Sequence, residues 1–279
     1  MDLRRLQQQA QAQGVHLHLV LKEWIHLLAL ECLSRKGAFP RLVFQGGTAL
    51  RLAYQGLRYS EDLDFVLKEG EKAFFSRLPE YLEHLPSALA PYPIVGGPIR
   101  LKEQKGTPTF RRFTLTIPIK ELRISDRTNI EVARIPSYEN EPRILRRAEI
   151  PISPVVQVES PREIFSDKLV AFGGRAYVKG RDLWDLNFLS QTLGVEMGEP
   201  VKRLAKKKLS DYRLGRAGFL SRFDANLRLL KSQGKTLLGA EMERFLPAPH
   251  RALFKETYPA LLKQVVHLLN DFRASLERR

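Results

Sequence analysis

The fold is decided by Gly46-Gly47-Thr48-Ala49-Leu50 together with Ser60-Glu61-Asp62-Leu63-Asp64-Phe65. The preceding Leu42-Val43-Phe44 predicts a short buried strand, and the two glycines let the chain turn from it into a helix. The start of a helix of this kind presents N–H groups to an anion. We therefore expect Gly46, Gly47 and Thr48 to bind phosphates.

The second stretch places two carboxylates on one side of a strand. Asp62 and Asp64 alternate with Leu63 and Phe65, so both acids share a face. Magnesium prefers oxygen ligands and is usually held by one or two carboxylates plus the phosphates of a nucleotide. A bare Asp-x-Asp more often marks a solvated face, but the upstream glycine turn favours a Mg²⁺ or Mn²⁺ site. The implied reaction is attack on a nucleoside triphosphate.

Three further residues are candidates for the same site, each with an alternative. Glu131 lies between Ile130 and Val132, where a third carboxylate could arise, although many surface strands look the same. Arg51 follows Gly47 by one helical turn and could hold a phosphate or pair with a carboxylate. Ser60 could contact the triphosphate or form a bend before the strand.

Composition limits the possible classes of function. The chain has 279 residues, a net charge of +15 and a pI near 10.0, which favour a polyanionic partner. Cys32 is the single cysteine, so no internal disulfide can form and a reducing cytoplasm is expected. The six histidines show no paired spacing, so we predict no zinc site. The apolar run 24–33 contains His26 and Glu31 and is too short to span a bilayer, so we expect no membrane association.

The order of predicted elements indicates an α+β protein with two lobes. Residues 1–159 are expected to form leading helices and a mixed-sheet lobe, and residues 160–279 a helical lobe. Ser160-Pro161-Arg162-Glu163 is a capping box that predicts a helix start at this boundary. Strands are predicted at 42–44, 62–67, 99–103, 110–119, 130–135 and 155–158.

Four motifs resemble those of the AbiEii/MenT toxin family, within the DNA polymerase β-like nucleotidyltransferase superfamily. The first two are Gly46-Gly47-Thr48-Ala49-Leu50 and Arg58-Tyr59-Ser60-Glu61-Asp62-Leu63-Asp64-Phe65. Asp167-Lys168-Leu169-Val170-Ala171 is similar to the family's lysine motif, and Lys179-Gly180-Arg181-Asp182-Leu183-Trp184-Asp185-Leu186 to its final motif. The motifs occur in the family's order and cover about half of the chain.

The resemblance implies a polymerase β-like fold and an activity. Lys168 would contact the triphosphate, Asp182 would belong to the active site, and Asp185 would support it. The enzyme would transfer a nucleoside monophosphate to an acceptor hydroxyl, a tRNA 3′ end in the favoured case, and release pyrophosphate. Asp62 or Glu131 would be the general base. Such toxins are normally inhibited by a cognate antitoxin.

Basic residues are concentrated between Val201 and Lys235. The segment Lys202, Arg203, Lys206, Lys207 and Lys208 spreads its charges around a helix, which suits contact with an RNA backbone. The alternatives are a solvated face or a surface for an acidic protein.

Two other functions remain open on the sequence alone. The acceptor could be a protein or a small molecule, in which case RNA would acquire no label. The chain could also be a nucleotide- or RNA-binding module without catalysis, in which case Asp62→Ala would leave binding unchanged.

Overall fold

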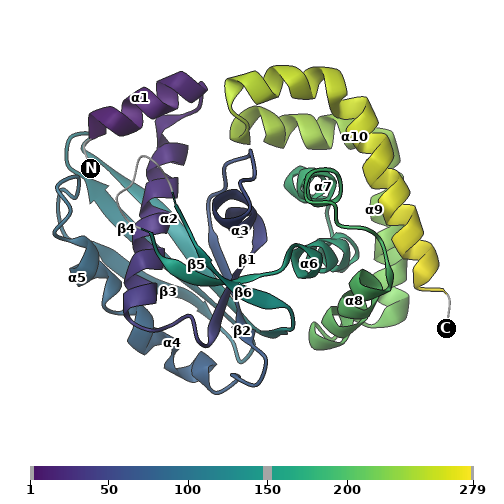
Figure 1. The fold of residues 1–279 in the computed structure, drawn as a ribbon, viewed down its shortest axis with the longest axis horizontal. Coiled ribbons are helices and arrows are strands. Elements are labelled where there is room, and N and C mark those ends of the chain that lie inside the picture. The colour runs from purple at the N-terminus through teal and green to yellow at the C-terminus, as the bar shows by residue number, and fades with distance from the viewer. Residues whose placement is uncertain (1–2, 147–152, 278–279) are drawn as a thin grey trace. The chain divides into compact units, whose positions relative to one another are not determined.

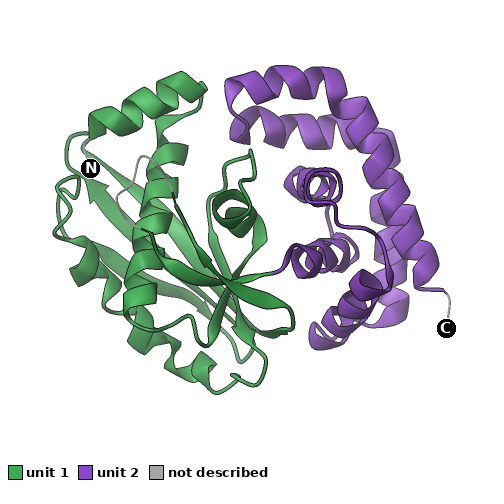
Figure 2. Cartoon of the chain, viewed as in Figure 1, with its two compact units in different colours: residues 1–159 green, residues 160–279 purple. Residues whose placement is uncertain are grey.

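The computed structural model describes residues 3–146 and 153–277, and the chain divides into two compact units (Figure 2). Unit 1 comprises residues 1–159 and unit 2 residues 160–279. Unit 1 contains a mixed sheet with helices, and unit 2 is helical. The predicted α+β class, with a mixed-sheet lobe and a helical C-terminal lobe, is confirmed.

Unit 1 places β2 at the centre of a seven-stranded sheet with the order β3-β4-β5-β2-β1-β7-β6 (Figure 1). The strands are β1 Leu42–Gln45, β2 Leu63–Lys68, β3 Arg100–Gly106, β4 Phe110–Ile119, β5 Ile124–Ser137, β6 Asn140–Ile144 and β7 Val155–Glu159. The helices of this unit are α1 Leu3–Gln13, α2 Leu17–Arg35, α3 Gly46–Ala53, α4 Phe74–Leu82 and α5 Leu85–Leu89. Strand β2 pairs antiparallel with β1 and parallel with β5. The acidic motif, Asp62-Leu63-Asp64, therefore lies at the start of the central strand of the sheet.

The two faces of the sheet differ in chemistry because side chains alternate along each strand. Phe44 and Phe65 lie opposite each other on one face, with ring centroids 5.4 Å apart. Helix α2 packs against β5, and its His26 contacts Thr128 on the same face. The opposite face carries Asp64, and we call it the carboxylate face.

Strand β4 shows the same division and leads to an edge of the sheet. Its alternate residues Phe113, Leu115, Ile117 and Ile119 are buried, whereas the residues between them are half-buried. Strand β3 pairs antiparallel with β4 and is the last strand on that side, with a shift of register between Glu103 and Lys105.

Unit 2 begins at the predicted capping box. The Ser160 hydroxyl accepts a hydrogen bond from the backbone N–H of Glu163 at 3.1 Å, which stabilises the first turn of the first helix. The core includes Phe223, whose ring lies edge-on to that of Phe172. The helices are α6 Pro161–Gly174, α7 Gly180–Asn187, α8 Glu199–Asp211, α9 Arg216–Phe245 and α10 Ala248–Ser275, with a π-helical turn at Phe188–Thr192.

Across residues 3–146 and 153–277, every helix is too short or too polar to cross a membrane.

Candidate active site

The glycine turn joins β1 to α3 beside the acidic motif. Gln45 is extended, and Gly46 has φ +77°, a left-handed conformation that glycine adopts without strain. A Cβ atom on Gly46 would lie 2.7 Å from Oδ2 of Asp64, and a Cβ on Gly47 would collide with the guanidinium of Arg58. Glycine is therefore favoured at position 46 by its backbone conformation and by the nearby carboxylate, whereas a larger residue at position 47 would displace the end of the Arg58 side chain.

Asp62, just before β2, is oriented by a chain of neutral donors from β5 and β4. Nδ2 of Asn129 donates to Oδ1 of Asp62 at 3.0 Å. The Thr114 hydroxyl donates in turn to Oδ1 of Asn129 at 2.9 Å. The Thr48 hydroxyl donates to the backbone carbonyl of Asp62, so the glycine turn and the acidic motif are linked directly. The Thr48 hydroxyl thus has a structural role, and its backbone N–H lies in the first turn of α3.

Asp64 and Glu131 are neighbours in the parallel pairing of β2 with β5. Their shared register places both side chains on the carboxylate face. Asp62 and Asn129 lie two residues before Asp64 and Glu131, respectively, and therefore on the same face. Nε of Arg112 donates to Oε1 of Glu131 at 2.8 Å, while 43% of the Arg112 side chain is exposed. The three acids proposed from the sequence are therefore on one face of the sheet.

A buried histidine supports the acidic motif from the opposite face. Nε2 of His26 lies 2.7 Å from the Thr128 hydroxyl and 3.1 Å from the carbonyl of Glu61, and that hydroxyl donates to the same carbonyl at 2.9 Å. Burial, aided by the nearby charge of Lys22, lowers the pKa of His26 to about 3. A neutral imidazole therefore fixes the backbone next to Asp62.

Arg51 takes the second of the two roles that its position allowed. Its Nε lies 2.6 Å from Oε2 of Glu23, and its Nη1 donates to the carbonyls of Gly56 and Leu57. The guanidinium thus holds the segment after α3 against α2 and is engaged by partners within the fold. Ser60 lies half-buried in the irregular segment before β2.

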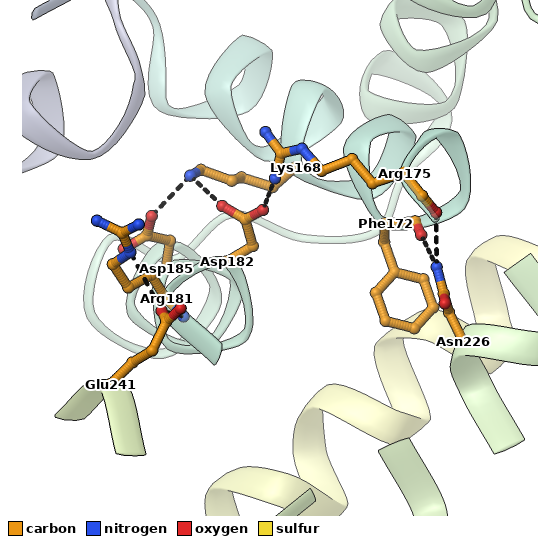
Figure 3. Close-up of polar contacts among 8 residues, drawn as sticks. All are labelled: Lys168, Phe172, Arg175, Arg181, Asp182, Asp185, Asn226 and Glu241. Carbon is orange, nitrogen blue, oxygen red and sulfur yellow. Dashed lines mark hydrogen bonds and ion pairs between the residues drawn. The ribbon is translucent and has the colours of Figure 1, made fainter. Parts of the chain in front are cut away.

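Unit 2 brings Lys168, Asp182 and Asp185 into one cluster (Figure 3). Nζ of Lys168 lies 2.6 Å from Oδ1 of Asp182 and 2.8 Å from Oδ2 of Asp185, and Arg175 donates to the other oxygen of Asp182. Burial alone would raise the pKa of Asp182, but the charges of Lys168 and Arg175 outweigh it and hold the pKa well below its usual range. Asp182 is therefore ionised and compensated within unit 2.

Lys208 requires a correction. It was predicted to lie on an RNA-binding surface, but its side chain is fully buried, with Nζ 2.7 Å from Glu163 and 3.1 Å from Asp167. The reason is its place in the helix, because it continues the apolar stripe that includes Val201 and Leu204.

The other predicted basic residues of α8 lie at its surface. Arg203, Lys206 and Lys207 are exposed. Lys202 is partly exposed and pairs with Glu199.

Sequence reasoning missed four residues that shape the site: Thr114, Asn129, His26 and Arg58. Asn129 precedes Glu131 by two residues, so the strand period alone could have placed both on one face. His26 gave no such signal, because its partners, the Thr128 hydroxyl and the Glu61 carbonyl, are distant in sequence. Arg58 begins the second motif, but nothing in that motif points to its place beside Gly47.

Comparison with known proteins gives a family and a fold. Residues 28–278 match a family model described as the nucleotidyl transferase AbiEii toxin of a type IV TA system. Among curated proteins no sequence matches the chain. The crystal structure of JHP933 from Helicobacter pylori aligns with 95% of each chain at a TM-score of 0.53 and 20% identity, which shows a shared fold. A provisionally assigned nucleotidyltransferase of H. pylori aligns with 92% of each chain at a TM-score of 0.47 and 19% identity.

Proposed function

The chain belongs to the AbiEii family of nucleotidyl transferase toxins of type IV toxin–antitoxin systems, and on this premise we propose its reaction. The enzyme transfers a nucleoside monophosphate from a nucleoside triphosphate to the 3′-hydroxyl of an RNA, with tRNA as the favoured acceptor. The acceptor oxygen forms a bond to the α-phosphorus, the bond between the α- and β-phosphates breaks, and pyrophosphate leaves. A cognate antitoxin would restrain the activity.

One observation carries the proposal: the glycine turn contacts an acid of the motif. Gly46 lies so close to Asp64 that a methyl group would not fit between them. The first turn of α3 starts at this glycine, and Gln45 makes no side-chain cap to that turn. Backbone N–H groups suited to phosphate therefore lie beside carboxylates suited to a cation.

The residues present fit a hard divalent cation. Asp62 and Asp64 offer carboxylate oxygens on one face. The side-chain amide of Asn129 donates to Oδ1 of Asp62 and so orients that carboxylate. Magnesium prefers such oxygen ligands, so we assign Asp62 and Asp64 as its protein ligands. When bound, the ion would offset the negative charge that develops on the transferred phosphoryl group. Glu131 is a weaker choice for a third ligand because Arg112 engages its Oε1.

The remaining roles follow from the contacts of each residue. Gly46, Gly47 and Thr48 would donate backbone N–H groups to the triphosphate. We assign Oδ2 of Asp62 as the acceptor of the proton from the attacking hydroxyl, with Oδ1 held by Asn129.

In unit 2 we propose Lys168 as a further contact to the triphosphate, as the motif resemblance implies. Asp182 and Asp185 would hold its ammonium group in one position. The exposed cations of α8, Arg203, Lys206 and Lys207, are proposed to contact the RNA backbone.

A labelling experiment tests this function. Purified protein is incubated with total RNA, Mg²⁺ and each α-³²P-labelled nucleoside triphosphate in turn, and the RNA is separated by gel. We expect label in the tRNA band and equimolar pyrophosphate, both abolished by EDTA. RNA oxidised with periodate lacks the 3′-hydroxyl and is the matched control, which should stay unlabelled. Label in oxidised RNA or in protein would contradict the proposed acceptor, and no transfer from any triphosphate would contradict the enzyme.

A further inference from the structure

The carboxylate face extends beyond the proposed metal site onto two more strands. Parallel pairing of β2 with β5 and antiparallel pairing of β5, β4 and β3 align side chains in rows across the sheet. One row consists of Asp64, Glu131, Arg112 and Lys105, the next of Asp62, Asn129, Thr114 and Lys102, and the third of Arg127, Thr116 and Arg100.

The charge of these rows changes sign with distance from the acidic motif. The outer positions are occupied by cations, and we call Arg100, Lys102, Lys105, Arg112 and Arg127 the basic sheet surface. All five are solvent-exposed at least in part. In these rows Glu131 lies next to one of the five cations, Arg112, and forms an ion pair with it. An anionic chain on this surface would therefore gain contacts without displacing several internal ion pairs.

Helices of unit 1 lie on the other side of these strands. Thr128 and Phe113 alternate along their strands with the residues of the rows, so they lie on the opposite face. Thr128 contacts His26 of α2, and the Phe113 ring lies against Arg111. Arg111 donates to the carbonyl of Phe75 in α4. The polar character of the rows thus follows from their position on the face opposite these helices.

An aromatic ring lies among the cations. Phe110 of β4 is half-buried and is two residues from Arg112, hence on the same face. Nζ of Lys105 lies 5.6 Å from the centre of the Phe110 ring, and Cζ of Arg112 lies 5.8 Å from it. Proteins bind single-stranded nucleic acid with this combination of an aromatic stacking platform and cations that follow the phosphates.

We propose that the basic sheet surface binds the single-stranded end of the acceptor RNA. Phosphates would contact the cations of β3, β4 and β5, a base would stack at Phe110, and the rows would lead the terminal nucleotide toward Asp62. A single strand is favoured over an acidic peptide because the ring between cations suits a base, and over a duplex because stacking requires an unpaired base. This inference rests on the proposed function for its direction toward Asp62.

Binding can be tested independently of catalysis. A fluorescein-labelled 12-nucleotide single-stranded RNA is titrated with the full chain in EDTA, without nucleoside triphosphate, and anisotropy is recorded at several salt concentrations. Arg100→Glu with Lys102→Glu should raise Kd at least about tenfold and lower the salt slope by about 1.4, since each lost phosphate contact removes ~0.7. Phe110→Leu should raise Kd about fivefold or more through lost stacking.

The matched control reverses two exposed lysines elsewhere in unit 1, Lys36→Glu with Lys72→Glu, and changes the net charge equally. We call Arg100→Glu with Lys102→Glu the β3 variant. The proposal is overturned if the control weakens binding as much as the β3 variant does, or if the wild-type chain binds no RNA. It is also overturned if a polyglutamate peptide competes better than RNA. Binding as expected without any transfer of label would instead refute the proposed function and leave this surface established. Transfer to RNA that is unchanged in the β3 variant would refute the surface alone.

Discussion

The two units surround their aspartates with different partners. In unit 1, Asp62 accepts a hydrogen bond from the neutral amide of Asn129, at the surface of a sheet. In unit 2, Asp182 is buried between the cations Lys168 and Arg175. A charge that the fold already compensates mainly maintains structure, whereas one oriented by neutral donors can still attract a cation from solution.

The largest expected effect comes from removing one charge at the sheet. Asp62→Asn should lower the rate of nucleotide transfer about 10³-fold or more, because a metal ligand stabilises the transition state by several kcal/mol. The melting temperature should stay within about 2 °C, because the side chain keeps its volume and its Oδ1 can still accept from Asn129. Initial rates of label transfer and calorimetry measure the two quantities.

Asp182→Asn provides the contrast in unit 2. It leaves Lys168 and Arg175 with one fewer carboxylate, so the melting temperature should fall clearly. A variant that is inactive yet as stable as the wild type would break the distinction between the two units.

The next effect concerns the buried lysine. Lys208→Met should lower the free energy of unfolding by about 3–5 kcal/mol, because Glu163 and Asp167 would lose their buried cation. Lys206→Met, on the exposed side of the same helix, should change it by less than about 0.5 kcal/mol. Denaturation in urea compares the variants, and equal stabilities would show that the buried ion pairs contribute little.

A smaller effect depends on pH. The folded pKa of His26 is about 3, below the value of 6.5 expected when unfolded, so its contribution to stability is complete above pH 6.5. As pH falls below 6.5 the unfolded state binds the proton first, so the free energy of unfolding should fall by about 2 kcal/mol by pH 5. Stability measured from pH 8 to pH 4 should show this loss.

The matched variants assign the pH dependence to one residue. His26→Gln should flatten the profile, whereas His267→Gln, at an exposed position, should not. Asp182 behaves differently, because its lowered pKa contributes stability above about pH 3.8 that is lost only at more acidic pH. If the stability contributions of His26 and Asp182 were lost over the same pH range, the expected difference between the two units would be absent.

The smallest effect is expected for a positioning residue. Asn129→Ala should reduce kcat about tenfold, because Asp62 loses the donor that orients it, with little change in KM for the triphosphate. Asn226→Ala is the counterpart in unit 2, where the amide donates to the carbonyls of Phe172 and Arg175. That change should lower stability by about 1–3 kcal/mol. A stability loss in Asn129→Ala larger than in Asn226→Ala would contradict the assignment.

The sequence predicted most of the sheet because its strands follow simple patterns. The strand predicted at 110–119 matches β4 in full, since apolar and polar residues alternate throughout. Strand β5 extends from Ile124 to Ser137, and its first half was missed because both of its faces carry polar residues. Strand β6 was also missed, since Asn140–Ile144 contains proline and charged residues and little apolar periodicity.

Residues near the site were predictable where one motif specifies the chemistry. The glycine turn and the acidic pair are close in sequence, and local geometry places them together. The short helices α4 and α5 were not predicted within the strand-rich region, although Phe74, Phe75 and Leu78 show helical spacing. The partners of Lys208 and His26 depend on tertiary packing, which no local pattern encodes.

The position of β3 has a consequence for the behaviour of the protein at high concentration. This strand ends the sheet, and a bare edge of that kind can pair with another molecule and start aggregation. Lys102, Lys105 and the irregular register beside them oppose such pairing. The cations proposed to hold RNA would thus also keep the purified protein monodisperse, and replacement by glutamate preserves this protection where leucine would remove it.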